Sequence, residues 1–180
     1  MIYVFMANGT EEIEALACVD VLRRAELDVQ IVGVGGKVIT GSHGITVAAD
    51  IGEDEISTDG LQMIVLPGGM PGTLHLEQSR AVQQLLGYCA EREILIAAIC
   101  AAPSILGHRG LLKGRKAVCF PGFEEQLLGA KLVKEPVCQD GTFITAKGMG
   151  VAVDFALKLV EVLCSPAKSE KIRASLQCAR

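Results

Sequence analysis

The sequence predicts an α/β fold, a doubly wound, mostly parallel sheet with helices on both faces. Strand-like and helix-like segments alternate from the start: apolar Ile2 to Met6, a helical pattern from about Glu11 to Ala25, then apolar Val29 to Val34. This order is a β-α-β unit of compact length. The run from Ile94 to Ile99 has no polar side chain, although three charged residues precede it. Such a run is typical of a short strand that is buried on both faces of a parallel sheet.

The remaining elements follow in order. Glycines within 33–36 and 40–44 punctuate a hairpin region that resumes at Ile45 to Ala48, and a polar connection leads to a buried strand at Met63 to Leu66. That strand ends in a loop, Pro67 to Gly72, too rich in glycine and proline for a helix or strand interior. Further on we expect helices at about Ser79 to Glu91, Gly122 to Leu128 and Gly150 to Leu163, and strands at Lys116 to Cys119, Lys131 to Val133 and Thr142 to Thr145.

Length and composition restrict the class of protein. A chain of 180 residues, half of them hydrophobic, buries about 70% of its unfolded surface, so we expect one domain over residues 1–180. The net charge of −4 comes without a basic stripe, which argues against nucleic acid and membrane surfaces as partners. No stretch reaches the roughly 18 apolar residues of a membrane span. Seven cysteines at irregular spacing, without a C-x-x-C pair, indicate no metal site and favour a reducing cytoplasm.

Cys100 ends the buried run, and helix-forming residues follow at once. Pro103 suits the first turn of a helix, where its missing N–H has no partner to lose. Cys100 is therefore expected at the carboxyl edge of the sheet and at a helix amino terminus, where the helix dipole favours a thiolate. The alternative is an inert core cysteine, the commonest fate of a free thiol.

Two further segments end at the same edge, and ligands bind there in open parallel sheets. Asn8 is expected to cap the first helix, with Glu11 reaching back as in a capping box. Glu14 begins an apolar helix, so partial burial would raise its pKa and let it shuttle a proton; the alternative is a carboxylate that merely complements the dipole. Gly68 and Gly69 either make a tight turn or expose N–H groups which, with the amide of Ala101, form an oxyanion hole.

These motifs, Ala97-Ala98-Ile99-Cys100-Ala101-Ala102-Pro103, Asn8-Gly9-Thr10-Glu11-Glu12-Ile13-Glu14 and Leu66-Pro67-Gly68-Gly69, resemble the ThiJ/PfpI superfamily in its DJ-one and YajL-like branch. Their order and spacing match over essentially the whole chain. The resemblance implies a flavodoxin-like sandwich and a homodimer. It also implies that Cys100 is an oxidisable nucleophile, that Glu14 hydrogen-bonds its sulfur, and that the amides of Gly69 and Ala101 line the pocket.

The histidines depart from the family pattern. Protease-like relatives carry a histidine directly after the nucleophile, where this chain has Ala101, so a Cys-His protease is disfavoured. The pocket histidine of the animal proteins would fall at about Gly129 to Leu132, which contains none. His43 takes the place of a neighbouring pocket arginine and is a candidate for the pocket, together with Gly68, or for a dimer edge. His75 is expected in a solvated loop, and His108 as a helix C-terminal cap.

Three functions remain open. If the chain is an enzyme, Cys100 would add to an electrophilic carbonyl, as in methylglyoxal or its glycated protein adducts, while Glu14 relays protons. The resemblance implies that this is a stress-protective glyoxalase or deglycase reaction. As a redox sensor or chaperone, Cys100 would be oxidised to sulfenic and sulfinic acid. As a scaffold, the chain would carry an unreactive thiol. No cofactor is indicated, because Gly33-Val34-Gly35-Gly36 lacks the spacing of a dinucleotide-binding loop.

Overall fold

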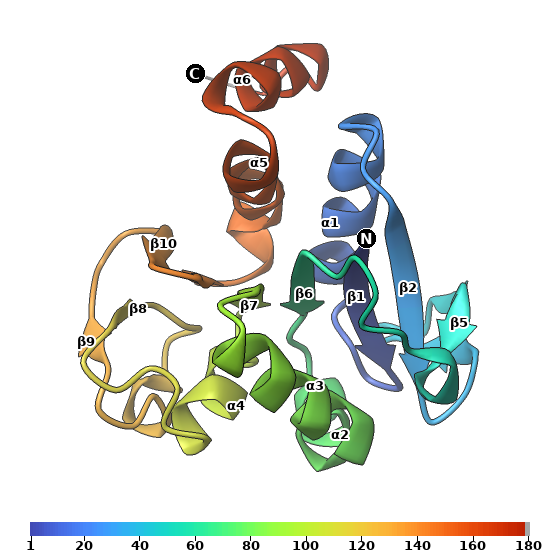
Figure 1. Ribbon diagram of the computed structural model, residues 1–180, viewed down its shortest axis with the longest axis vertical. Coiled ribbons are helices and arrows are strands. Elements are labelled where there is room, and N and C mark those ends of the chain that lie inside the picture. The colour runs from blue at the N-terminus through green and yellow to red at the C-terminus, as the bar shows by residue number, and fades with distance from the viewer. Residues whose placement is uncertain (179–180) are drawn as a thin grey trace.

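The computed structural model describes residues 1–178 and is built on a seven-stranded sheet in the order β10-β11-β7-β6-β1-β2-β5 (Figure 1). Only the edge strand β10 runs antiparallel to its neighbour, which confirms the predicted mostly parallel sheet. The strands of this sheet are β1 (Ile2–Ala7), β2 (Val29–Val34), β5 (Ile51–Gly52), β6 (Met63–Leu66), β7 (Leu95–Ile99), β10 (Val137–Asp140) and β11 (Phe143–Ala146).

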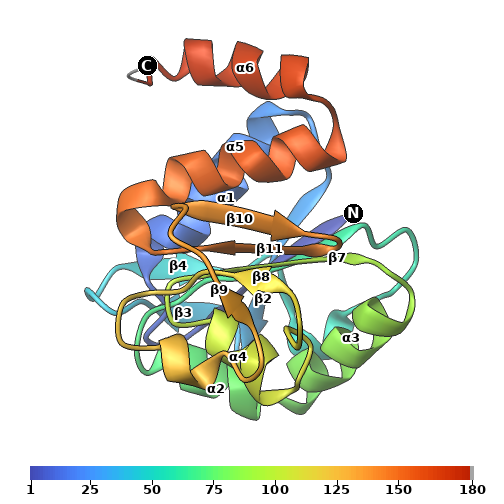
Figure 2. The same ribbon diagram turned by 90° about the vertical axis from the view of Figure 1, so that its left-hand side faces the viewer.

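Helices cover both faces of the sheet, as the fold class requires. Figure 2 shows α1, α5 and α6 stacked on one face and α2, α3 and α4 on the other. The helices are α1 (Glu12–Arg24), α2 (Gly72–Gln78), α3 (Arg80–Glu91), α4 (Pro103–His108), α5 (Ala152–Leu163) and α6 (Pro166–Ser175).

The side chains of β1 point alternately to the two faces of the sheet and contribute to a separate hydrophobic core on each face. Ile2, Val4 and Met6 belong to the cluster formed with α1 and α5, while Tyr3 and Phe5 belong to the cluster with α2, α3 and α4. All of them are buried. Because successive strand side chains point to opposite faces, a strand apolar at every position must lie between two layers.

Two small sheets lie outside the central one. The predicted hairpin is confirmed as β3 (Val38–Thr40) against β4 (Thr46–Ala48). The strands expected at 116–119 and 131–133 shorten to β8 (Lys116–Ala117) and β9 (Lys131–Leu132), which pair with each other and add nothing to the central sheet. The helix expected at 122–128 is only a 3-10 turn, Glu124–Gln126, one of three such turns with Glu53–Glu55 and Met149–Val151.

Several local expectations were wrong or incomplete. α2 follows the glycine loop at once, although Pro71 and Gly72 at its start suggested an irregular segment, and β10 and α6 were not expected. Asn8 does not cap α1: its side-chain oxygen accepts from the amide of Thr40, and the cap is Glu11, which accepts from the amide of Ile13. Long-range pairing with the hairpin thus overrides the local capping rule.

The topology brings the predicted motifs together. β6 pairs in parallel with β1 on one side and with β7 on the other. The carboxyl ends of these three neighbouring strands therefore carry Asn8, Pro67 and Cys100 to one edge of the sheet. Within residues 1–178, no helix has both the length and the apolarity that crossing a bilayer needs.

Candidate active site

Cys100 lies on a strained turn between β7 and α4. Its φ is 66°, in the left-handed region, which costs a non-glycine residue about 1–3 kcal/mol. Two backbone hydrogen bonds hold the turn: the Cys100 amide donates to the carbonyl of Ala146 at 3.0 Å, and its carbonyl accepts from the amide of Phe120 at 2.8 Å. The strain is therefore fixed by neighbouring segments, and the thiol is half-buried at the sheet edge.

Glu14 lies in the first turn of α1 and is completely buried. Its Oε2 accepts from the amide of Gly68 at 2.8 Å. Its Oε1 is the one buried side-chain nitrogen or oxygen in residues 1–178 that lacks a hydrogen-bond partner. A buried carboxyl oxygen without a donor is expensive as an anion and suited to carrying a proton.

Gly68 makes this close approach possible. A Cβ at this position would lie 2.6 Å from the Cβ of Cys100 and 2.8 Å from Oε2 of Glu14. Any side chain would therefore force the thiol and the carboxyl apart. Gly69, with a φ of 87°, turns the chain against the backbone of Glu11. The glycine pair is thus a packing requirement of the site as well as a turn.

Cys100 and Glu14 share an environment that disfavours charge on either. Burial raises the pKa of Glu14 to about 7, against the opposing effects of the Gly68 amide and the Cys100 thiol. Burial, followed by the charge of the Glu14 carboxylate and a hydrogen bond to it, raises the pKa of the Cys100 thiol to about 12. Next to an ionised Glu14, Cys100 is therefore a neutral thiol, and the prediction that it would be a thiolate was wrong. Helix α4 begins only at Pro103 and has six residues, so its dipole does not outweigh these effects.

The backbone on the other side of the sulfur favours negative charge. The amides of Ala101 and Gly69 both lower the pKa of the Cys100 thiol. Neither amide donates to a backbone carbonyl in a turn or loop. The structure therefore gathers Cys100, Glu14, Gly68, Gly69 and Ala101 in one place.

A hollow of about 280 Å³ is lined by Gly148, which lies next to the sulfur, although Cys100 itself is not part of the lining. A Cβ on Gly148 would lie 3.8 Å from Sγ of Cys100 and 3.1 Å from the ring of Phe120. Sequence reasoning missed these residues, because it placed the position of the relatives' pocket histidine at about Gly129 to Leu132. That segment lies instead near Lys113 and Arg115. The hollow is lined by Phe120, Pro121, Lys147, Gly148, Met149, Gly150 and Val151.

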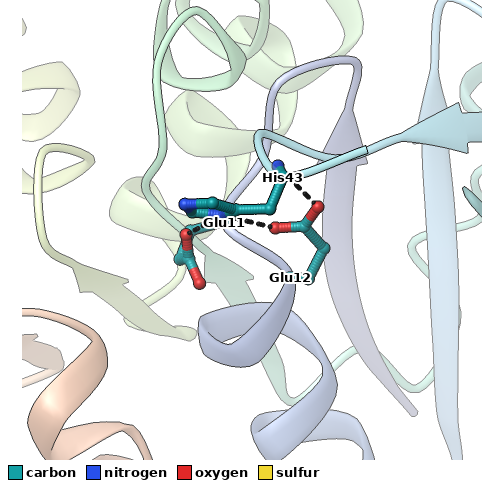
Figure 3. Close-up of side chains that lie close together, drawn as sticks. All are labelled: Glu11, Glu12 and His43. Atoms are coloured by element: carbon teal, nitrogen blue, oxygen red, sulfur yellow. Dashed lines mark hydrogen bonds and ion pairs between the residues drawn. The ribbon is translucent and has the colours of Figure 1, made fainter. Parts of the chain in front are cut away.

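His43 makes its polar contacts with Ser42, Glu11 and Glu12, and none with Cys100 or Glu14. Figure 3 shows it beside Glu11 and Glu12. Its Nδ1 lies 3.1 Å from Oε2 of both Glu11 and Glu12. One nitrogen or oxygen atom from each of the three side chains lies within 4.8 Å of the other two, a spacing that could hold a metal ion. However, Glu12 already accepts from the amides of His43 and Ile45 and from the Ser42 hydroxyl. We call Glu11, Glu12, Ser42 and His43 the hairpin clasp.

The other two histidines lie away from the thiol. His75 is on α2 rather than in a loop, and its Nδ1 lies 2.8 Å from the carbonyl of Asn8. His108 is the last residue of α4, but Arg109 is the cap, and His108 instead pairs with Glu77 at 2.6 Å. In the described part of the chain, no histidine makes a polar contact with Cys100.

Comparison with known proteins identifies the family and agrees with the fold. The family model described as the DJ-1/PfpI family matches residues 1–162. Protein dj-1beta of Drosophila melanogaster is 34% identical over 98% of this chain and 96% of its own length. Glutathione-independent glyoxalase DJR-1.2 of Caenorhabditis elegans is 31% identical over 96% and 93%, respectively. The structure of oxidized Toxoplasma gondii DJ-1 superposes with a TM-score of 0.95 at 36% identity, over 99% of this chain and 98% of that one. By sequence and by fold, the chain belongs to the DJ-1/PfpI family.

Proposed function

We propose that the chain converts small α-oxoaldehydes such as methylglyoxal, or the early adducts they form on proteins, into α-hydroxy acids. Cys100 is the nucleophile and Glu14 the acid and base. The observation that carries the proposal is the unpartnered Oε1 of Glu14, buried next to the Cys100 thiol. The relative from Caenorhabditis elegans that is named a glyoxalase supports the reaction class.

The proton on the pair determines the reactivity. Groups that interact this strongly titrate as a unit, so one proton is shared between sulfur and carboxyl over a wide pH range. When Oε1 of Glu14 holds this proton, the carboxylate charge that raises the Cys100 pKa is gone. Burial, the largest cause of the raised pKa, remains, and the amides of Ala101 and Gly69 oppose it by favouring the thiolate. The reactive form is thus a neutral Glu14 beside a charged sulfur.

The chemistry balances with water as the only co-reactant. The thiolate forms a bond to the aldehyde carbon, and the carbonyl oxygen takes the Glu14 proton to give a hemithioacetal. Glu14, now a carboxylate, moves the C1 proton to C2, and the C1 hydroxyl proton passes to the C2 oxygen, which leaves a thioester. Water cleaves the thioester, releasing the hydroxy acid and returning one proton to the pair. Glu14 protonates the carbonyl oxygen and moves the C1 proton with a buried carboxyl whose pKa lies near neutrality, where general acid–base catalysis is most effective.

The remaining assignments of the site follow from this reaction. The amides of Gly69 and Ala101 stabilise the oxyanion that develops when sulfur adds to the carbonyl. Small reactive carbonyl compounds and glycated proteins are then the partners, in a stress-protective role in the cytoplasm. We further propose a homodimer, because Ile13 and Ile45 leave apolar side chains exposed beside the hairpin clasp.

A second function, redox sensing through Cys100, has its own support. Cys100 is half-buried, whereas Cys18 and Cys89 are completely buried, and the similar Toxoplasma gondii protein has been solved in an oxidized form. The thiol would take one oxygen from each of two peroxide molecules, giving sulfenic and then sulfinic acid and releasing one water each time. A protonated Glu14 would donate a hydrogen bond to the oxidised sulfur.

One panel tests both functions. Purified wild type, Cys100→Ser and Cys164→Ser are assayed for methylglyoxal loss and lactate formation, and their intact masses are measured after mild peroxide treatment. Cys164 is an exposed thiol and serves as the matched control. We expect lactate from the wild type and from Cys164→Ser, and none from Cys100→Ser. Turnover by Cys100→Ser would refute the proposed nucleophile. Sensing without catalysis would show two added oxygens on Cys100 and no lactate from any protein.

A further inference from the structure

We infer that the hollow beside Cys100 is a subsite for the apolar substituent of an α-oxoaldehyde, with Phe120 as the residue that sets specificity. The inference rests on the proposed function and narrows its substrate class. It predicts that neutral aldehydes with an aryl or branched alkyl group react better than glyoxal or carboxylated analogues.

The position of Phe120 relative to the sulfur is the first argument. Gly148 separates the two, because its missing Cβ would lie 3.8 Å from Sγ and 3.1 Å from the Phe120 ring. An aldehyde carbon bonded to the sulfur can therefore place its substituent over Gly148 and against the ring. A side chain on Gly148 would occupy that path, so a glycine keeps it open.

The composition of the wall is the second argument. Phe120 is 47% exposed and Met149 is 50% exposed, and both line the hollow together with Pro121 and Val151. Exposed large apolar side chains that gather round a concave site mark a place where apolar groups bind. At about 280 Å³ the hollow suits a small substituent rather than a cofactor.

The Glu14 side of the site is the third argument. The amide of Met149 lowers the pKa of Glu14, so the segment that lines the hollow also approaches the proposed acid and base. The loop that lines the hollow therefore approaches the sulfur through Gly148 and the carboxyl through Met149. Lys147 is the only charged residue in this lining. If its positive charge determined specificity instead, a substrate with a carboxylated substituent would be preferred.

Phe120→Ala tests the inference without disturbing the turn. The hydrogen bond from Phe120 to the Cys100 carbonyl comes from the backbone amide, which alanine retains. Leu128→Ala is the matched control: Leu128 is 53% exposed and apolar, and it does not line the hollow. Phe120→Leu separates loss of the ring from loss of apolar surface.

The measurement is kcat/KM for phenylglyoxal, 4-carboxyphenylglyoxal and glyoxal in the four proteins. We expect phenylglyoxal to be the best substrate of the wild type. Phe120→Ala should lower its kcat/KM relative to glyoxal by about tenfold, with a smaller loss in Phe120→Leu and none in Leu128→Ala. An unchanged ratio in Phe120→Ala, or a preference for the carboxylated aldehyde, would overturn the inference while leaving Cys100-dependent turnover intact. If no aldehyde were consumed, the proposed function itself would fail.

Discussion

Two carboxyl groups in the first turn of α1 have nearly the same burial and opposite chemistry. Glu12 is 2% exposed and Glu14 is completely buried. Burial alone would raise the pKa of Glu12, but hydrogen bonds from its own amide, from the amides of His43 and Ile45 and from the His43 ring lower it to about 2. The amide of Gly68 donates to Glu14, and Cys100 and the Met149 amide also lower its pKa, but burial outweighs them and raises the pKa to about 7. The larger number of donors at Glu12 and the deeper position of Glu14 together decide which carboxyl is charged.

The difference separates a structural acid from a chemical one. Glu12 fastens the β3–β4 hairpin to α1 within the hairpin clasp (Figure 3). Glu14 keeps one oxygen without a partner and remains free to exchange a proton. Their contributions to stability therefore depend on pH with opposite signs, and each side chain can be altered without touching the other.

Replacing Glu14 should have the largest effect, and on turnover rather than on folding. Glu14→Gln retains an oxygen for the Gly68 amide but cannot hold or release the proton, so we expect kcat to fall by about 10²–10⁴-fold. Because the folded pKa lies above the usual 4.5, the wild type loses stability as pH rises from about 4.5 to about 7. The neutral variant avoids that loss and should be the more stable protein at pH 8.

Rate and urea unfolding measured at pH 4.5 and pH 8 test this expectation, with Glu12→Gln as the control. A Glu14→Gln protein that kept kcat within threefold of wild type would remove Glu14 from the mechanism. A variant less stable than wild type at pH 8 would show that its carboxylate is stabilising, like that of Glu12.

Replacing Glu12 should have the next largest effect, this time on stability. In Glu12→Gln an NH₂ group must face either the amides of His43 and Ile45 or the Ser42 hydroxyl and the His43 ring. Leaving buried donors unsatisfied costs about 1–3 kcal/mol. The wild-type contribution is present above pH 4.5 and is lost as pH falls toward 2. Urea unfolding at pH 7 measures the loss, and an unchanged midpoint would show that the clasp does not anchor the hairpin.

The sequence predicted the part of the site that depends on local rules. Cys100 follows a fully apolar strand, and Gly68 follows another, so strand order alone brings them together. It also indicated Glu14, because a carboxyl that begins an apolar helix is buried wherever that helix packs. The wall formed by Phe120 and Met149 escaped prediction, because it depends on the return path of loops that lie distant in the sequence.

The clasp escaped prediction for a related reason. Local capping rules predict that Asn8 caps α1. Instead, the Asn8 side chain accepts a hydrogen bond from Thr40 of the hairpin, and Glu11 is the cap. Which donors reach Glu12 depends on the path of residues 42–45, which no periodicity reports. Sequence patterns therefore indicated Glu14 and its raised pKa, but they gave no sign that Glu12 would be the buried carboxyl that stays charged.

Replacing His43 should have the smallest effect, and it divides the clasp into side-chain and backbone parts. His43→Ala removes the ring from Glu11 and Glu12 but keeps the backbone amide that donates to Glu12 at 2.8 Å. The hydrogen bond to Glu12, aided by the charge of Glu11, raises the pKa of His43 above 6.5. Its stabilisation is therefore complete below pH 6.5 and lost as pH rises through the higher folded value. Thermal unfolding should show a lower Tm for the variant at pH 5.5 and no difference at pH 9.

His75→Ala is the control, since the His75 ring contacts a carbonyl rather than a carboxylate. An equal Tm at both pH values would mean that backbone donors alone keep Glu12 charged, which would sharpen the contrast with Glu14.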